Sequence, residues 1–182
     1  MLHFTMALGL SLLPSYSVAS DQYDQLIRDS WEKRVRHVHW GHAWAQVKQE
    51  SAFRCDAVSP VGAAGCAQFM PGTWNDMQRL GIVPDSATPF NPRWAFEAQA
   101  YYMDYLLRFW KSPRTHESWV NLATASYNAG AGNILKSQKL CNGAVEYGEI
   151  MECLPVVTGH HHKETQHYVK NINKYRIERF GK

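Results

Sequence analysis

The most informative absences in this sequence concern long apolar runs, excess charge and strand-like alternation. No apolar run is long enough to span a bilayer, and the chain has no internal repeat and no low-complexity segment. A formal net charge of +3 at pH 7 is too small to indicate a nucleic-acid partner. No segment alternates between polar and apolar residues for more than four positions, so little β structure is expected. The 182 residues are 45% hydrophobic and 13% aromatic, which is enough for one mainly α-helical domain with a packed core.

Residues 1–19 have the layout of a secretory signal peptide. The apolar core "MALGLSLL" is followed by the helix breaker Pro14 and by the small residues Ser17 and Ala19. We therefore expect cleavage after Ala19, an exported domain over residues 20–182, and no stable membrane span once the signal is removed. The first residues include no Lys or Arg, so a buried N-terminal helix is the alternative.

The chain has only four cysteines, and they form two pairs that are close in sequence. Cys55 lies near Cys66, and Cys141 lies near Cys153, although four cysteines allow three pairings. The local pairing would close two short loops, each stabilising the fold by roughly 2–3 kcal/mol. We expect disulfides if the chain is exported, with Cys141–Cys153 pinning a polar, Gly-containing loop. Four reduced, buried thiols are the alternative in a reducing compartment.

Apolar periodicity and capping signals predict several helices. The expected helices cover residues 21–37, a segment carrying Glu50, residues 73–80 with Thr73 as N-cap, a long helix that follows Asn91 (N-cap) and Pro92, a helix that stops at Gly130, and residues 163–179. The long helix has a wide face at core spacing, comprising Ala95, Ala98, Gln99, Tyr102, Tyr105, Leu106 and Phe109.

One carboxylate continues an apolar helix face. Glu50 follows, at the spacing of a single face, the residues Trp40, Ala43, Trp44 and Val47. A carboxyl group in such surroundings loses hydration in its charged form, so its pKa should rise and it can serve as a general acid near neutral pH. The alternative is a buried ion pair, for which Arg54 is the nearest cation in sequence.

Three stretches place polar residues in apolar or Gly-rich context: "ESAFRCDAVSPVGAAGCAQFMP", "ATASYNAG" and "ETQHYVKNI". Together they resemble the three motifs of the soluble lytic transglycosylase (SLT) domain, a lysozyme-like family that cuts the glycan strands of peptidoglycan. The matching positions are Glu50, Ser51, Ser59, Gly62, Gly65, Gln68, Met70 and Pro71; then Tyr127 to Gly130; then Glu164, Thr165, Tyr168 and Val169. The chain departs from the family at "GCAQ", where Cys66 and Ala67 stand in place of Leu and Met.

The resemblance implies a mainly α, lysozyme-like fold with a substrate cleft, and it implies that Glu50 is the catalytic acid and base. It also implies a set of residues around the scissile bond: Ser59, Gln68 and Met70 lining subsites, Tyr127 and Asn128 close to the acid, and Glu164 and Tyr168 facing the cleft from the last helix. For that last pair, bracing the helix that carries the acid is an equally good expectation.

The implied reaction is cleavage between N-acetylmuramic acid and N-acetylglucosamine with formation of a 1,6-anhydro ring and no cofactor. A hydrolase resembling goose-type lysozyme is the runner-up, and a non-catalytic wall-binding module is a third hypothesis that the presence of Glu50 disfavours. The implied partner is the peptidoglycan strand in the periplasm or cell envelope of a bacterium. A secretion or conjugation apparatus, or a phage particle, stays open as a further partner.

The run "GHHHKETQH" supplies metal-ligand types at His160, His161, His162 and His167, with Cys153 nearby. Three adjacent histidines cannot all face one ion from a regular element, and no Cys-x-x-Cys or His-x-x-x-His pair accompanies them. We therefore predict no metal site and an exposed loop before the last helix.

Overall fold

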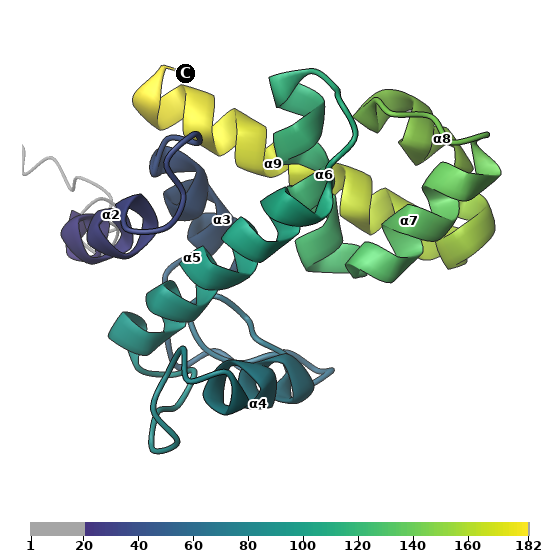
Figure 1. The fold of residues 1–182 in the computed structure, drawn as a ribbon. Helices are drawn as coiled ribbons and strands as arrows, with labels where there is room; N and C mark the ends of the chain where they lie inside the picture. The colour runs from purple at the N-terminus through teal and green to yellow at the C-terminus, as the bar shows by residue number, and fades with distance from the viewer. Residues whose placement is uncertain (1–20, 182) are drawn as a thin grey trace, which may run out of the picture.

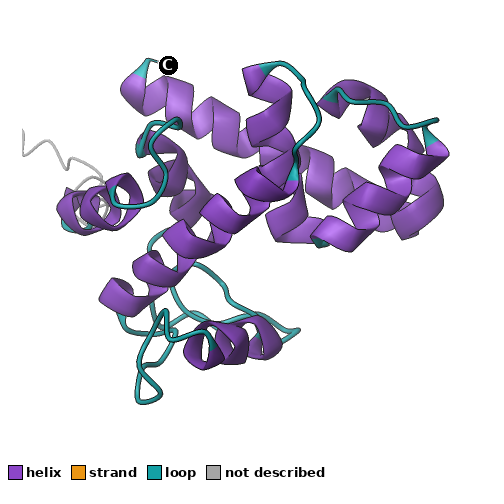
Figure 2. Cartoon of the chain, in the orientation of Figure 1, coloured by secondary structure: helices purple, strands orange, loops and turns teal. Residues whose placement is uncertain are grey.

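The computed structural model describes residues 21–181, so the expected signal peptide lies outside the described residues. Within this range the fold is helical, with isolated bridges at Val58, Ala64 and Phe69 in place of any strand (Figure 2). The elements are α2 (Asp24–Glu32), α3 (Gly41–Ser51), α4 (Pro71–Arg79), α5 (Pro92–Phe109), α6 (His116–Ala129), α7 (Ala131–Leu140), α8 (Tyr147–Thr158), the 3₁₀ turn η1 (Gly159–His161) and α9 (His162–Phe180). The mainly α prediction is confirmed. No helix among these is long and apolar enough to cross a bilayer.

The core divides into two hydrophobic clusters. The larger is built by α2, α3, α5, α6, α7, α8 and α9. The smaller lies in residues 52–91, here called the small lobe, where Phe69, Trp74 and Met77 pack against Ala98 of α5. In Figure 1, α4 of the small lobe lies below α5 and apart from the other helices. Tyr102 and Tyr127 contact both clusters, so the two clusters meet at these two rings.

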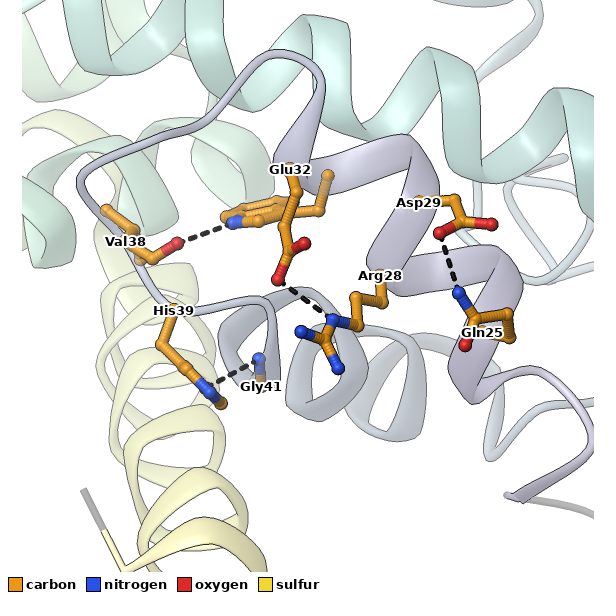
Figure 3. A network of polar contacts seen from close by, with 8 residues as sticks. Gln25, Arg28, Asp29, Glu32, Val38, His39 and Gly41 are labelled. Carbon is orange, nitrogen blue, oxygen red and sulfur yellow. Dashed lines mark hydrogen bonds and ion pairs between the residues drawn. The ribbon is translucent and has the colours of Figure 1, made fainter.

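The first helix is shorter than predicted, because α2 ends at Glu32. The Trp31 indole N–H donates to the Val38 carbonyl oxygen at 2.7 Å, which folds the following segment back over the buried Trp31 ring. Figure 3 shows this turn, with the exposed Arg28–Glu32 ion pair of α2 on one side and the His39 ring accepting from the Gly41 N–H on the other. The periodicity up to His37 therefore reflects a turn that buries Val35 and Val38, and not a continued helix.

Helix α5 begins as predicted, since the Asn91 side chain accepts from the Arg93 N–H and Pro92 occupies the first turn. Its predicted inner face is buried or partly buried, with one error: Tyr105 is 48% exposed. Helix α4 begins at Pro71 with Met70 as N-cap, so the assignment of Thr73 as N-cap is wrong. A proline at the first helical position sets the N-cap three residues earlier than predicted.

The region between α6 and α9 differs most from expectation, because it contains the unpredicted helices α7 and α8. Both local disulfides, Cys55–Cys66 and Cys141–Cys153, are present. The second joins the end of α7 to α8, so it pins two helices in place of the expected loop.

The histidine run is exposed at His160 and His161, as predicted, but it forms η1 and the start of α9 and is not a loop. The described residues contain no group of three or more His, Cys, Asp or Glu side chains placed to hold a metal ion. That the protein has no metal site stays a prediction from the sequence.

Replacing Cys141 and Cys153 together by serine should lower the free energy of unfolding by about 2–3 kcal/mol, because the bridge restricts the unfolded chain. Urea unfolding followed by tryptophan fluorescence, without reductant, measures the change. An unchanged midpoint for the double variant would contradict the expected contribution.

Candidate active site

Glu50 lies in the last turn of α3, and the backbone ends this helix sharply. Ala52 and Phe53 both take the left-handed conformation, with φ of 51° and 65°, so the chain turns away immediately after Ser51. The carboxyl group is therefore carried by a rigid helix but is not covered by a further turn of it. The stripe that precedes it is buried as predicted at Ala43, Trp44 and Val47.

The partner of Glu50 is a tyrosine and not a cation. The Tyr168 hydroxyl of α9 donates a short hydrogen bond to Glu50 Oε1. Arg54 is exposed and its Nε donates to the Ser51 carbonyl at 3.2 Å, so the predicted alternative of a Glu50–Arg54 ion pair is wrong.

The surroundings of Glu50 favour the protonated carboxyl. Its pKa is raised to about 8: burial raises the pKa most, the hydrogen bond from Tyr168 lowers it, and the negative charge of Glu164 raises it by a smaller amount. A carboxyl group with this pKa holds its proton at neutral pH, which is the state that a general acid requires.

The segment between α3 and α4, residues 52–70, is here called the motif loop. The Ser51 hydroxyl donates to the Cys66 carbonyl at 2.8 Å and ties this loop to the helix that carries Glu50, alongside the Cys55–Cys66 disulfide. The Ser59 hydroxyl accepts from the Ala63 N–H at 2.9 Å. These contacts shape the loop from within.

Gln68 also contributes to the shape of the motif loop. Its Nε2 donates to the carbonyls of Ala57 at 3.2 Å and Gly65 at 2.9 Å. Of the three predicted subsite residues in this loop, Met70 is the one that is largely open to solvent, at 44% exposed. Ser59 and Gln68 each use one polar group on the loop itself.

Helix α6 brings its motif residues toward Glu50. The Tyr127 hydroxyl donates to the Ala67 carbonyl at 2.9 Å, and the pKa of Tyr127 is raised by burial and by the charge of Glu50. Tyr127 therefore holds the motif loop by this hydrogen bond and lies within electrostatic range of Glu50.

Asn128 connects α6 to α9. Its Oδ1 accepts from the Thr165 hydroxyl at 2.8 Å, and its Nδ2 donates to Glu164 Oε1 at 3.4 Å. A hollow of about 310 Å³ extends from here, lined by Asn128, Ala129, Asn133, Val157, Thr158, His161, Glu164 and Thr165. Glu164, which lines this hollow, carries a negative charge that acts on Glu50.

Glu164 and Tyr168 lie one turn apart on α9 and differ in burial and in their contacts. Tyr168 is 4% exposed and braces α9 against Glu50, whereas the Glu164 side chain is 68% exposed and faces the hollow. The bracing role is thus found at Tyr168.

Three residues near Glu50 were not predicted as site residues: Gln46, Ser51 and Gln99. Gln46 donates to the Tyr168 hydroxyl at 3.1 Å and accepts from Gln99 Nε2 at 3.0 Å. A signal existed for all three, and for Ser51 it was its position beside Glu50 in the first family motif. Gln46 precedes Glu50 by one helical turn, and Gln99 is a polar residue within the predicted inner face of α5.

Two glycines of the motif loop offer a matched test of its packing. Gly62 and Gly65 both have positive φ, at 87° and 79°. A Cβ at Gly62 meets nothing within 4 Å, whereas a Cβ at Gly65 would overlap the Pro89 carbonyl. Gly62→Ala should cost about 1–2 kcal/mol for backbone strain alone. Gly65→Ala should cost clearly more, because the backbone of the small lobe must move. Thermal unfolding of the pair measures the difference, and equal costs would contradict the close approach.

Glu50→Gln should stabilise the fold, and increasingly so as the pH rises from 5 to 8. In this range the unfolded state has released the Glu50 proton while the folded state retains it, so wild-type stability falls as pH rises. The variant lacks this loss and should gain on the order of 1–3 kcal/mol at pH 7. Urea midpoints at several pH values measure it. The exposed Glu152 supplies the control, since Glu152→Gln should show no such growing difference.

Comparison with known proteins supports what the motifs imply. The chain matches the transglycosylase SLT domain family over residues 31–146. The soluble lytic murein transglycosylase of Salmonella typhimurium is 29% identical over 145 residues, which cover 78% of this chain and 21% of that protein. The chain therefore spans about a fifth of the length of the curated relatives it matches.

Solved structures agree. The 70 kDa soluble lytic transglycosylase of Escherichia coli superposes with a TM-score of 0.67 at 25% identity, over 85% of this chain and 23% of that one. An inactive mutant of the lytic transglycosylase Slt of Pseudomonas aeruginosa, a glutamate-to-glutamine change, gives 0.67 at 27% identity with the same coverage. With the family match covering more than half of its length, this chain belongs to the transglycosylase SLT domain family.

Proposed function

We propose that this protein is a lytic transglycosylase of peptidoglycan. It cleaves the β-1,4 bond between N-acetylmuramic acid and N-acetylglucosamine and leaves 1,6-anhydromuramic acid ends. The observation that carries the proposal is Glu50, a carboxyl group held on a rigid helix end with a pKa of about 8. Family membership and the names of the relatives support the same chemistry.

The first step uses Glu50 as an acid. Its proton passes to the oxygen that links the two sugars, the bond from that oxygen to C1 of N-acetylmuramic acid breaks, and the N-acetylglucosamine side leaves with a free hydroxyl. The positive charge that develops at C1 is stabilised by the substrate's own N-acetyl group. Glu50 is now a carboxylate, which the Tyr168 hydroxyl stabilises by its hydrogen bond.

The second step uses Glu50 as a base. The carboxylate removes the proton from the C6 hydroxyl of the muramic acid residue, whose oxygen then bonds to C1 and closes the anhydro ring. Glu50 regains its proton and no water is consumed. Two-carboxylate glycosidases instead activate a water molecule or form a glycosyl–enzyme bond.

The residues proposed to contact the glycan fall into two groups. Met70, Asn128 and Glu164 offer exposed or hollow-lining groups and are proposed to contact sugar directly. The others position the site while presenting part of their surface to it: Ser59, Gln68, Tyr127 and Tyr168.

The runner-up, hydrolysis of the same bond, gains one observation. The charge of Glu164 acts on Glu50, so a second carboxylate lies in the neighbourhood. Its exposure and its contact with Asn128 favour a binding role over activation of water. The mass of the products decides between the two reactions.

We propose the cellular setting of the reaction from the sequence of residues 1–19 and from the two disulfides. The layout of residues 1–19 and the two disulfides support export to an oxidising compartment of the cell envelope. A role beside a secretion or conjugation apparatus, or in a phage particle, is open on this basis.

Digestion of purified peptidoglycan followed by mass spectrometry tests the proposal. Wild-type protein should release fragments lighter by one water than hydrolytic products. Glu50→Gln should lose at least a thousandfold in rate, because both proton transfers are removed. Glu152→Gln, which alters an exposed carboxylate of α8, serves as the matched control. Reducing-end products would select the hydrolase, and a fully active Glu50→Gln would refute the role of Glu50.

A further inference from the structure

A chain of buried side-chain hydrogen bonds leads from α5 to the acid. Gln99 Nε2 donates to Gln46 Oε1 at 3.0 Å, Gln46 Nε2 donates to the Tyr168 hydroxyl at 3.1 Å, and Tyr168 donates to Glu50 Oε1. Gln46 and Gln99 are 0% and 1% exposed, so neither reaches the substrate. Buried polar groups must find partners, and here the partners form one directed series.

The direction of the series is set at its origin. Gln99 Nε2 also donates to the backbone carbonyl of Ala43 at 3.3 Å. A carbonyl oxygen can only accept, so the amide of Gln99 must point its NH₂ group toward α3. The same NH₂ group then meets Gln46, which must present its oxygen to Gln99 and its own NH₂ group to Tyr168.

The consequence falls on the single proton of the Tyr168 hydroxyl. A phenol has one proton to donate and oxygen lone pairs with which to accept. Because Gln46 donates to Tyr168, the hydroxyl has no acceptor on that side and directs its proton to Glu50. With the Gln46 amide reversed, its oxygen would compete with Glu50 for this proton.

We propose that Gln46 and Gln99 are positioning residues, which act through Tyr168 to hold Glu50 Oε1 as the anchored oxygen and leave Oε2 as the oxygen that exchanges protons with the substrate. The inference rests on the proposed function, since it assigns parts to Glu50 as acid and base. One arrangement serves both steps. Oε1 accepts from Tyr168 whether Oε2 carries its proton or has released it, so no group need turn between the two steps.

The test uses Gln46→Met and Gln99→Met, which keep side-chain length but remove the amide. The first removes the donor to Tyr168, and the second frees the Gln46 amide to reverse. Gln138→Met is the matched control, since Gln138 is a partly buried glutamine whose amide donates to the Ala144 carbonyl at 2.7 Å, at the end of α7. Rates of glycan cleavage are measured against pH and substrate concentration, and thermal unfolding confirms that each variant is folded.

Gln46→Met should lower kcat about tenfold or more and leave KM unchanged, since the residue does not meet the glycan. The alkaline limb of the rate profile should move to higher pH, because a weakened hydrogen bond from Tyr168 no longer offsets the raised pKa of Glu50. Glu164 and Tyr127, the other ionisable groups around Glu50, are untouched in these variants. Gln99→Met should show the same changes in smaller measure, and it carries the test if Gln46→Met does not fold.

The decisive arm places Gln46→Met in a Tyr168→Phe background. Because Gln46 acts only through the Tyr168 hydroxyl, the second substitution should add little to the loss in kcat and should not move the alkaline limb further. Losses that multiply, or a limb that stays at its wild-type pH in both single variants, would overturn the proposal. All rates are taken as glycan cleavage relative to wild type, whichever end is produced, so a hydrolytic product would overturn the proposed function without deciding the role of Gln46.

Discussion

The hydrogen bond from Tyr168 to Glu50 is the contact on which the site depends, because it joins the two helices that pack side by side through the larger cluster. Helix α3 carries Glu50 and α9 carries Tyr168, at positions 118 residues apart. The bond supplies the charge stabilisation that a buried carboxylate needs without supplying a cation, which would lower the pKa too far for an acid. Burial raises the pKa of Glu50 and so favours the protonated carboxyl, whereas the hydrogen bond from Tyr168 lowers this pKa and stabilises the carboxylate.

The sequence predicted the parts of the fold in which local signals agree. Helix α5 has an N-cap at Asn91, a proline in its first turn and a long apolar face, and it was found as expected. Helices α7 and α8 were missed because Pro155 stands inside α8, and because the predicted Cys141–Cys153 disulfide was assigned to a loop and not to two helices. At the start of α4, the prediction took Thr73 as the N-cap, whereas Pro71 at the first helical position places the N-cap at Met70.

The candidate site was predictable as a set of positions but not as a set of contacts. Motif spacing brought Glu50, Tyr127 and Tyr168 together correctly. Motif spacing could not predict that Ser59 and Gln68 form hydrogen bonds within the motif loop, since both residue types suit either a subsite or a turn. Gln46 and Gln99 escaped notice for a related reason: a glutamine inside an apolar face has meaning only when its partner on another helix is known.

The two aromatic rings shared by the clusters have a consequence for how far the two clusters can move apart. Tyr102 and Tyr127 pack against each other with ring centroids 5.3 Å apart, and Tyr127 is also bonded to the motif loop. Separating the two clusters would expose both rings and break the hydrogen bond from Tyr127 to the Ala67 carbonyl. An opening motion at this point of the fold is therefore energetically unfavourable.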